Sequence, residues 1–316
     1  MTSTLLVTVD GTQIVDTQDE HAGDGDTTLD LTYSSVNYKD ALALNGNKGV
    51  VRIWPMVPGI DAVGTVVESP TLEAGTLVTV NGSGIGETRH GAYTPRMRID
   101  ASLITKVPSR FDDFSAAAIG TAGYTAALSV LGLGDFDGDV VVTGATGGVG
   151  SIAVQLLSSL GKNVIAVTGR VDEHGDYLRS LGAAEVMDRA ELSEPGKPLQ
   201  KGRFAAAVDT VGGVPLANVL AQVQMGGVVT ACGNAAGADL PTTVLPFILR
   251  GVALKGINSV TATPELRDEA WQLLANHLDL DSLASMTTTV DLAGTIEVGK
   301  SLLAGTHHGR TVVKVS

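Results

Sequence analysis

A short apolar stretch followed by a cluster of glycines constrains the fold of this chain more than any other feature. Residues 140–143, VVVT, are β-branched and uncharged, which predicts a strand buried on both faces. The glycines that follow within seven positions are Gly144, Gly147, Gly148 and Gly150. Apolar residues then recur at helical spacing from 149 to 160, and Gly161 is suited to end that helix. The stretch therefore predicts a strand, a glycine turn and an amphipathic helix, in that order.

This order is typical of a site for a dinucleotide. Glycine permits the tight turn, allows backbone N–H groups to approach a pyrophosphate, and lets the helix pack close to the strand. The N-terminus of the helix adds partial positive charge that favours phosphate groups. We therefore expect the turn to bind a dinucleotide cofactor. The alternative is a glycine-rich turn without a ligand.

The end of the next strand indicates which dinucleotide is bound. Residues 162–169, KNVIAVTG, are predicted to form this strand, and Arg170 follows it. A site for NAD usually carries a carboxylate at this position to bind the ribose 2′-hydroxyl. Here Asp172 and Glu173 come only later, whereas an arginine can pair with a 2′-phosphate. The sequence therefore favours NADP(H) over NAD(H), with a solvated loop charge as the alternative interpretation of Arg170.

Length, charge and cysteine content narrow the class of protein. A chain of 316 residues is long enough for about two domains. Its net charge of −13 disfavours nucleic acid and anionic membranes as partners. The predicted dinucleotide site instead indicates a small-molecule substrate. The single cysteine, Cys232, excludes an internal disulfide and fits a reducing compartment. The first residues lack the basic and apolar regions of a signal peptide, so we expect a cytoplasmic protein.

One uncharged segment, residues 115–134, has nearly the length of a membrane span. It is rich in alanine, contains four glycines and carries several hydroxyl groups. A stretch this weakly apolar is a poor membrane span. We therefore expect it to form buried helices of the core.

The secondary-structure pattern changes twice along the chain. Residues 1–114 are mostly strand-like, with one helical piece at 38–44, and residues 280–316 return to strand character. Between them, residues 115–279 alternate helices with apolar strands, as a doubly wound parallel sheet requires. The predicted strands of this middle part are 140–143, 164–168, 185–188, 205–209, 228–232 and 253–257. The sequence thus predicts an α/β protein in which a Rossmann domain (115–279) is inserted into a β-rich domain (1–114 and 280–316).

Several strings, collinear over nearly the whole chain, resemble one family. They are YSSVNYKDALALNG (33–46), PMVPGIDAVGTV (55–66), IGTAGYTAAL (119–128), LPTTVLPFILR (240–250) and GRTVVKV (309–315), besides the glycine turn. The chain resembles the zinc-independent branch of the medium-chain dehydrogenase/reductase family, the quinone oxidoreductase relatives. Within that branch it is most similar to the acryloyl-CoA reductase group.

The resemblance implies a GroES-like catalytic domain around the Rossmann domain, NADPH as cofactor, and a homodimer. It implies hydride transfer to the activated C=C bond of an α,β-unsaturated carbonyl compound, such as acryloyl-CoA or a similar short enoyl-CoA. Two alternatives remain: a quinone or generic enone oxidoreductase that uses NADPH, and a non-catalytic NADPH-binding protein.

Matching motifs extend the cofactor site beyond the glycines. They imply that Thr146 and Val149 join the glycines at the diphosphate. They place Thr168, Gly169 and Arg170 at the 2′-phosphate and Arg189 near the adenine. The remaining cofactor contacts that the resemblance implies are Tyr38, Asn234, Ile248 and Ser259.

We expect no metal in the site. The zinc-dependent branch of the family uses cysteine and histidine ligands, whereas Cys232 is the only thiol here and falls in a Rossmann strand. The six histidines are scattered without ligand spacing. The carbonyl of the substrate must then be activated by hydrogen bonds.

The candidate catalytic residues lie in two short motifs, NYKD and PGID. Hydride addition to a conjugated alkene produces an enolate, which requires hydrogen-bond donors at its oxygen and a proton at the α-carbon. Tyr38 is the candidate hydrogen-bond donor or proton source, and Asn37 the candidate amide donor. Asp40 and Asp61 are expected to orient their neighbours. The structural alternative is that Tyr38 packs against the cofactor and Asp40 braces a helix.

Residues 294–301, GTIEVGKS, match the phosphate-binding loop of nucleotide hydrolases. Too few residues follow to complete the sheet that such a loop needs. The apolar spacing predicts an amphipathic helix there instead.

Overall fold

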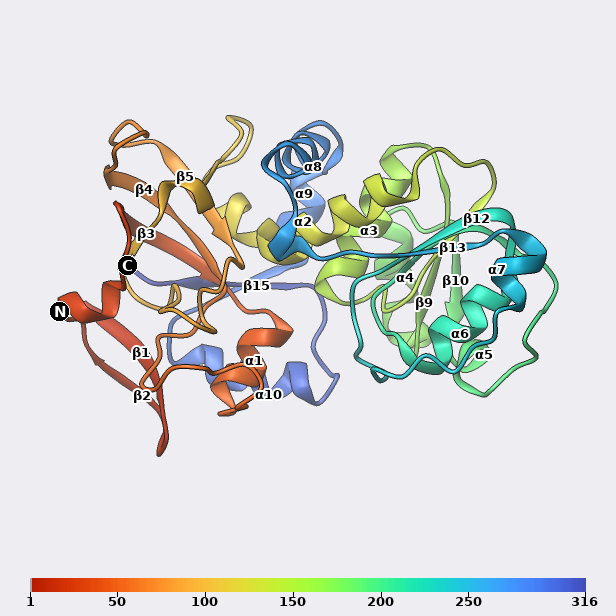
Figure 1. The fold of residues 1–316 in the computed structure, drawn as a ribbon, viewed down its shortest axis with the longest axis horizontal. Helices are drawn as coiled ribbons and strands as arrows, with labels where there is room; N and C mark the ends of the chain where they lie inside the picture. The colour runs from red at the N-terminus through yellow and green to blue at the C-terminus, as the bar shows by residue number, and fades with distance from the viewer. Residues whose placement is uncertain (1) are drawn as a thin grey trace. The chain divides into compact units, whose positions relative to one another are not determined.

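The computed structural model describes residues 2–316, which form two compact units, each with a sheet of its own (Figure 1). The first unit contains the described residues up to Ala122, together with Ser259–Ala262 and Leu280–Ser316. The second contains Gly123–Asn258 and Thr263–Asp279. The chain thus begins and ends in the first unit.

The first unit is built on a seven-stranded sheet in the order β14-β15-β3-β4-β5-β7, with β6 also paired to β3, and on a separate hairpin of β1 and β2. All its pairs are antiparallel except β14 with β15. The strands are β1 (Ser3–Thr8), β2 (Gly11–Asp16), β3 (Thr27–Ser35), β4 (Asp61–Glu68), β5 (Leu77–Asn81), β6 (Arg96–Ile99), β7 (Thr105–Lys106), β14 (Thr287–Val290) and β15 (Arg310–Lys314). The helices are α1 (Tyr38–Leu44), α9 (Leu280–Ser285) and α10 (Gly294–Leu303), with 3₁₀ turns at Asp19–Ala22, Ala101–Leu103 and Ser259–Thr261.

The last strand of the chain lies beside an early one. Val312 of β15 pairs with Ser35 at the end of β3, and Val313 pairs with Ser34. Residues from both ends of the chain, among them Leu29, Met56 and Val313, share one buried apolar cluster. Because of this pairing, side chains at the ends of β3 and β15 face the same buried region.

The second unit has a six-stranded, fully parallel sheet in the order β10-β9-β8-β11-β12-β13. Its strands are β8 (Asp139–Val142), β9 (Asn163–Thr168), β10 (Glu185–Asp188), β11 (Phe204–Asp209), β12 (Val223–Ala231) and β13 (Ala253–Gly256). Its helices are α3 (Gly148–Ser159), α4 (Val171–Ser180), α5 (Ala190–Ser193), α6 (Gly213–Gln222), α7 (Leu245–Arg250) and α8 (Pro264–His277).

This strand order places the first three strands on one side and the last three on the other, as in a Rossmann sheet. The apolar runs of β8 and β11 are buried on both faces, as the sequence predicts for central parallel strands. The predicted α/β class and doubly wound sheet are confirmed. Where the strand order reverses, between β8 and β11, the carboxyl ends of the strands offer the ligand crevice of such sheets.

The uncharged segment becomes α2 (Asp113–Leu133), which is interrupted at Gly120 (φ 47°, ψ −160°). It is the one helix among residues 2–316 that is long and apolar enough to span a membrane, yet 83% of its apolar window is buried inside the protein. It is therefore a core helix, in agreement with the sequence.

Two details differ from or refine the sequence-based expectations. At the end of the strand-like region 1–114, residues 101–106 form only a 3₁₀ turn, Ala101–Leu103, and the two-residue β7. The segment that matches a phosphate-binding loop is helix α10, as predicted. Gly299 in that segment serves helix packing: an added Cβ would lie 3.3 Å from Cδ1 of Leu44 in α1.

Candidate active site

The glycine turn between β8 and α3 has the shape that a pyrophosphate site requires. Gly144 adopts φ +60°, which favours glycine, and Gly147 precedes the first turn of α3. A Cβ on Gly150 would collide with the carbonyl oxygen of Gly144, so the helix approaches the turn only because glycine stands there. A glycine turn that leads into a helix N-terminus fits a dinucleotide phosphate.

The other residues expected at the diphosphate flank this turn. Thr146 is nearly buried within the turn and Val149 is half-buried in the first turn of α3. Ser151 donates its hydroxyl hydrogen bond to the carbonyl oxygen of Gly147 at 2.8 Å.

Two arginines follow the neighbouring strands β9 and β10, where the sequence predicts the 2′-phosphate. Thr168 is buried, and its carbonyl oxygen accepts a hydrogen bond from the backbone N–H of Arg189 at 2.9 Å. The guanidinium of Arg189 covers Gly169 so closely that a Cβ there would collide with it. Arg170 follows directly and precedes the first residue of α4. The structure thus brings Thr168, Gly169, Arg170 and Arg189 together.

A cavity of about 610 Å³ opens beside these residues. Gly169 and Arg170 line it, as do the carboxylates of Asp172, Glu173 and Asp188. Its charge is therefore mixed. Arginine offers bonds to a phosphate at this place, whereas the carboxylates suit ribose hydroxyls.

The three remaining cofactor candidates are more exposed. Asn234 is exposed in the loop after β12, and Ile248 on α7 is 69% exposed. Ser259 opens a 3₁₀ turn that belongs to the first unit.

Asp209, which the sequence-based reasoning does not include, organises the crevice at the end of β11. It is fully buried and accepts hydrogen bonds from Oγ1 of Thr143 at 2.7 Å and the backbone N–H of Gly212 at 2.7 Å. Burial raises its pKa above the usual range, against the effect of these bonds. The sequence could have indicated Asp209, because this aspartate ends a fully apolar strand and the glycines of DTVGG follow it.

In the first unit, the start of α1 presents Tyr38 to solvent. Oδ2 of Asp40 accepts a hydrogen bond from the backbone N–H of Asn37 at 2.8 Å, which fixes where the helix begins. Tyr38 is 45% exposed, and its hydroxyl has no hydrogen-bond partner among residues 2–316. Its neighbour Lys39 pairs with Glu87 at 2.6 Å. Tyr38 therefore has a hydroxyl available to a ligand.

A buried carboxylate lies behind this helix start. Asp61, the first residue of β4, is fully buried. It accepts hydrogen bonds from Ser35 Oγ at 2.6 Å, Asn37 Nδ2 at 2.8 Å, Asn81 Nδ2 at 2.8 Å, Thr121 N at 2.9 Å and Thr121 Oγ1 at 2.6 Å. The carboxylate thus ties β3, β5 and α2 to the start of α1.

Arg310 completes this cluster from the other end of the chain. Its guanidinium donates to the carbonyl oxygen of Ala118 at 2.6 Å, to Oδ1 of Asn37 at 3.2 Å and to Oγ of Ser35 at 3.0 Å. A Cβ on Gly120 would lie 2.5 Å from Oδ2 of Asp61, so the break in α2 makes room for these groups. We call Ser35, Asn37, Asp40, Asp61 and Arg310 the polar cluster.

The nitrogen and the oxygen of the Asn37 side chain are both hydrogen-bonded within the polar cluster. Its amide NH₂ donates to Asp61 and also, at 3.1 Å, to Oδ2 of Asp40, while its oxygen accepts from Arg310. The structure therefore brings together Asn37, Asp40 and Asp61, with Tyr38 at their exposed edge. The amide expected to donate to the substrate carbonyl thus makes its hydrogen bonds inside the protein, at the start of α1.

Asp40 carries a strongly shifted pKa. The side chain is fully buried, and its Oδ1 accepts from the backbone N–H of Ile60 at 2.9 Å. Burial and the nearby charge of Asp61 raise its pKa from 3.8 to about 7, although its hydrogen bonds act in the opposite direction. Asp40 thus titrates near neutrality.

Four residues that make these contacts were not predicted from the sequence as site residues. They are Ser35, Asn81, Thr121 and Arg310. Ser35, Asn81 and Arg310 are polar residues at the ends of apolar strands. That position is a weak signal, because only the pairing of β3, β4, β5 and β15 shows which strand ends coincide.

No group of three or more His, Cys, Asp or Glu side chains within residues 2–316 is arranged to hold a metal ion. Cys232 lies at the end of β12, where burial raises its thiol pKa to about 12. The thiol is therefore protonated and unreactive at neutral pH.

Two successive parts of the chain match known protein families. Residues 23–109 match the alcohol dehydrogenase GroES-like domain, and residues 148–276 match the family described as zinc-binding dehydrogenase. The sequence is 44% identical to the "Probable acrylyl-CoA reductase AcuI" of Escherichia coli strain K12, over 100% of both chains.

Two solved structures show the same fold over the full length. The yhdH oxidoreductase of Salmonella enterica in complex with NADP is 43% identical, with a TM-score of 0.96 and 100% of both chains covered. The yhfP protein of Bacillus subtilis with NAD bound is 36% identical, with a TM-score of 0.93, and the match covers 99% of this chain and 98% of that one.

Proposed function

The chain belongs to the medium-chain dehydrogenase/reductase family, and from this premise we propose that it is an NADPH-dependent reductase of acryloyl-CoA or a similar short enoyl-CoA. The observation that carries the proposal is the full-length identity of 44% to a protein named as an acrylyl-CoA reductase. The glycine turn and Tyr38, with its available hydroxyl, supply the two functional parts that such a reductase needs.

The glycine turn and the two arginines fit NADP(H). Gly144, Gly147, Gly148 and Gly150 would hold the diphosphate, with Thr146 and Val149 beside them, and Arg170 with Arg189 would bind the 2′-phosphate. Asn234, Ile248 and Ser259 stay weaker candidates for cofactor contact. The relative from Salmonella enterica is in complex with NADP, whereas that from Bacillus subtilis has NAD bound. The paired arginines favour NADP(H) for this chain.

When bound, NADPH supplies the hydride that adds to the β-carbon of the conjugated alkene. Tyr38 donates a hydrogen bond to the carbonyl oxygen of the thioester, where negative charge develops, or gives the proton that the α-carbon receives. Asn37, Asp40 and Asp61 act through position: their hydrogen bonds fix the start of α1 and so the direction of Tyr38. No metal takes part in this scheme.

Two other functions must be distinguished from the proposed enoyl-CoA reductase by experiment. A quinone or generic enone oxidoreductase would share the fold and the cofactor and differ in the acceptor. A non-catalytic NADPH-binding protein would bind the cofactor and reduce no acceptor. The exposed Tyr38 hydroxyl at the edge of a charged cluster favours an enzyme over the second alternative.

The proposed assembly is a homodimer in the cytoplasm. Val244, Ile248 and Leu249, at and next to α7, are between 58% and 69% exposed, and β13 is an edge strand of its sheet. Exposed apolar side chains beside an open strand edge are typical of an interface between copies of a chain. The lone, protonated Cys232 suits a reducing compartment.

The decisive experiment measures oxidation of NADPH with acryloyl-CoA, crotonyl-CoA, simple enones and quinones as acceptors, repeated with NADH. We expect the highest kcat/KM with NADPH and a short enoyl-CoA. Faster turnover of a quinone would favour the first alternative. NADPH binding without turnover of any acceptor would favour the second.

A further inference from the structure

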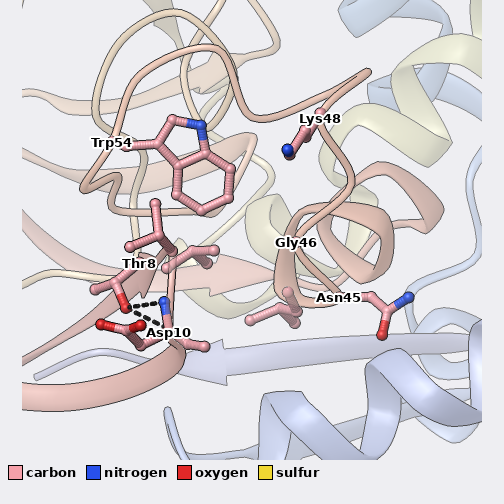
Figure 2. Close-up of a pocket in the computed structure, with 10 residues that line it drawn as sticks. Thr8, Asp10, Asn45, Gly46, Lys48 and Trp54 are labelled. Atoms are coloured by element: carbon pink, nitrogen blue, oxygen red, sulfur yellow. Dashed lines mark hydrogen bonds between the residues drawn. The ribbon is translucent and has the colours of Figure 1, made fainter.

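A cavity of about 730 Å³ in the first unit has no part in the scheme above. The turn of the β1–β2 hairpin forms one side of it, and the end of α1 with the following loop, residues 44–54, forms the other. Figure 2 shows Trp54 and Lys48 along one edge of this cavity, and Thr8 and Asp10 along the opposite edge. Its volume lies in the range of small-molecule sites.

The lining of the cavity offers three kinds of contact that an adenine nucleotide uses. Trp54 provides an aromatic surface on which a base can stack. Lys48, the only cation that lines the cavity within residues 2–316, can pair with a phosphate. Asp10 and the amide of Asn45 can accept hydrogen bonds from the exocyclic amine of adenine.

The position of Lys48 matters because the protein as a whole repels phosphates. The net charge is −13, so a phosphate needs a local cation to stay at the surface. Asp10 stands across the cavity from Lys48, which confines phosphate groups to the side of the cavity where Lys48 and Trp54 lie.

Helix α1 connects this cavity to Tyr38. Tyr38 is the first residue of α1, and Leu44, its last residue, lines the cavity. Seven residues of α-helix span about 10 Å. The pantetheine arm of CoA, with its two amide groups, extends over more than that length between the thioester and the phosphates.

We propose that this cavity binds the nucleotide end of the CoA thioester, with adenine on Trp54 and a phosphate on Lys48, while the thioester reaches Tyr38 along α1. This inference rests on the proposed function and adds to it the part of the chain that recognises CoA. It distinguishes an enzyme for CoA thioesters from a reductase of free enones.

A kinetic comparison tests the proposal. Acryloyl-CoA is compared with the acryloyl thioester of N-acetylcysteamine, which has the same reactive group and no nucleotide. We expect Lys48→Ala to lower kcat/KM for acryloyl-CoA about tenfold relative to the truncated thioester, the effect of one lost charge-assisted bond. Trp54→Leu should lower the same ratio about tenfold through lost stacking. Arg52→Ala, which removes an exposed cation of the same loop that does not line the cavity, should leave the ratio unchanged.

A binding measurement tests it without turnover. The chain has two tryptophans, Trp54 in the cavity and Trp271 buried in α8. Adenosine 3′,5′-bisphosphate, a fragment of CoA, should quench the fluorescence of the wild-type protein. The quenching should be lost in Trp54→Phe. In Lys48→Ala, the affinity for the bisphosphate, measured by the same quenching, should fall about tenfold.

The results separate this inference from the proposed function. An unchanged ratio in both variants, or no quenching by the bisphosphate, overturns the inference even if acryloyl-CoA is reduced. Equal affinity for ATP also overturns it, because the site would then be a general nucleotide site. If neither thioester is reduced, the proposed function fails, and the fluorescence titration still decides whether the cavity binds the CoA nucleotide.

Discussion

Arg310 fixes the orientation of the Asn37 side chain across 273 residues of sequence. Nη1 of Arg310 can only donate, so the atom of Asn37 that it meets at 3.2 Å is the amide oxygen. The opposite end of the same amide then donates to the carboxylates of Asp61 and Asp40. The start of α1, and with it Tyr38, is therefore held by charges on both sides.

Replacing Arg310 should destabilise the first unit severely. Arg310→Met leaves Asp61 buried without its nearby cation and removes three donated hydrogen bonds. We expect the free energy of unfolding to fall by about 3–5 kcal/mol, measured by denaturant titration. Arg310→Lys should lose less, because it keeps the charge without the forked geometry. Arg98→Met, an exposed arginine on β6, is the control, and an equal loss in both Met variants would refute the role of the polar cluster.

Removing the Tyr38 hydroxyl should impair the reaction and leave the fold intact. Because this hydroxyl has no partner among residues 2–316, Tyr38→Phe should not change the melting temperature. We expect kcat for acryloyl-CoA to fall about 10²-fold, as for loss of a positioned acid. Tyr33→Phe removes a hydroxyl from a tyrosine packed edge-on against Phe114 and should keep full activity. An undiminished kcat in Tyr38→Phe would mean that another group supplies the proton.

Replacement of Arg170 should change the choice of cofactor. Arg170→Ala is expected to raise KM for NADPH about tenfold and KM for NADH much less, because only NADPH has a 2′-phosphate. Arg189→Ala should act in the same direction. Arg179→Ala, which breaks only a surface pair with Asp176, serves as the control. Equal changes in both KM values would remove Arg170 from the 2′-phosphate site.

Substitution of the turn glycines should distinguish a glycine that serves packing from one that serves ligand binding. Gly150→Ala places a methyl group against the carbonyl of Gly144 and should lower the free energy of unfolding by about 1–3 kcal/mol. The Cβ of Gly147→Ala would lie 3.3 Å from the same oxygen, so the loss of stability should be smaller. Gly147→Ala should instead weaken NADPH binding, measured by calorimetry. The same loss of stability in both variants would contradict this division.

Stability should depend on pH through Asp40. Its pKa is raised in the folded protein from 3.8 to about 7, so the folded state holds this proton more tightly than the unfolded state. The stability that the proton contributes is complete below pH about 4 and is lost as pH rises to about 7. Asp40→Asn, which cannot titrate, should show a weaker decline of unfolding free energy over this interval. Asp16→Asn, at an exposed position, should keep the wild-type decline; an unchanged slope in Asp40→Asn would be evidence against the shifted pKa.

Local patterns determined the elements of this protein. The apolar run 140–143, the glycines after it and the helical spacing from 149 specify a strand, a turn and a helix through contacts between near neighbours. The same reasoning identified residues 294–301 as a helix although their letters match a phosphate-binding loop. The periodicity of apolar residues indicates which face of a segment is buried, and it depends only on residues close together in the sequence.

Only the tertiary structure decided how the polar cluster and the cavity lined by Lys48 and Trp54 are composed. Nothing in the neighbourhood of Arg310 in the sequence indicates that it meets Ser35 and Asn37, since that meeting follows from the pairing of β15 with β3. The raised pKa of Asp40 likewise depends on burial beside Asp61, and the cavity on a hairpin placed against the loop after α1. The sequence by itself determined the strand, glycine turn and helix of residues 140–160 and helix α10, because these depend on neighbours along the chain. Charge networks and cavities depend on which distant segments pack together, and that is decided by the fold as a whole.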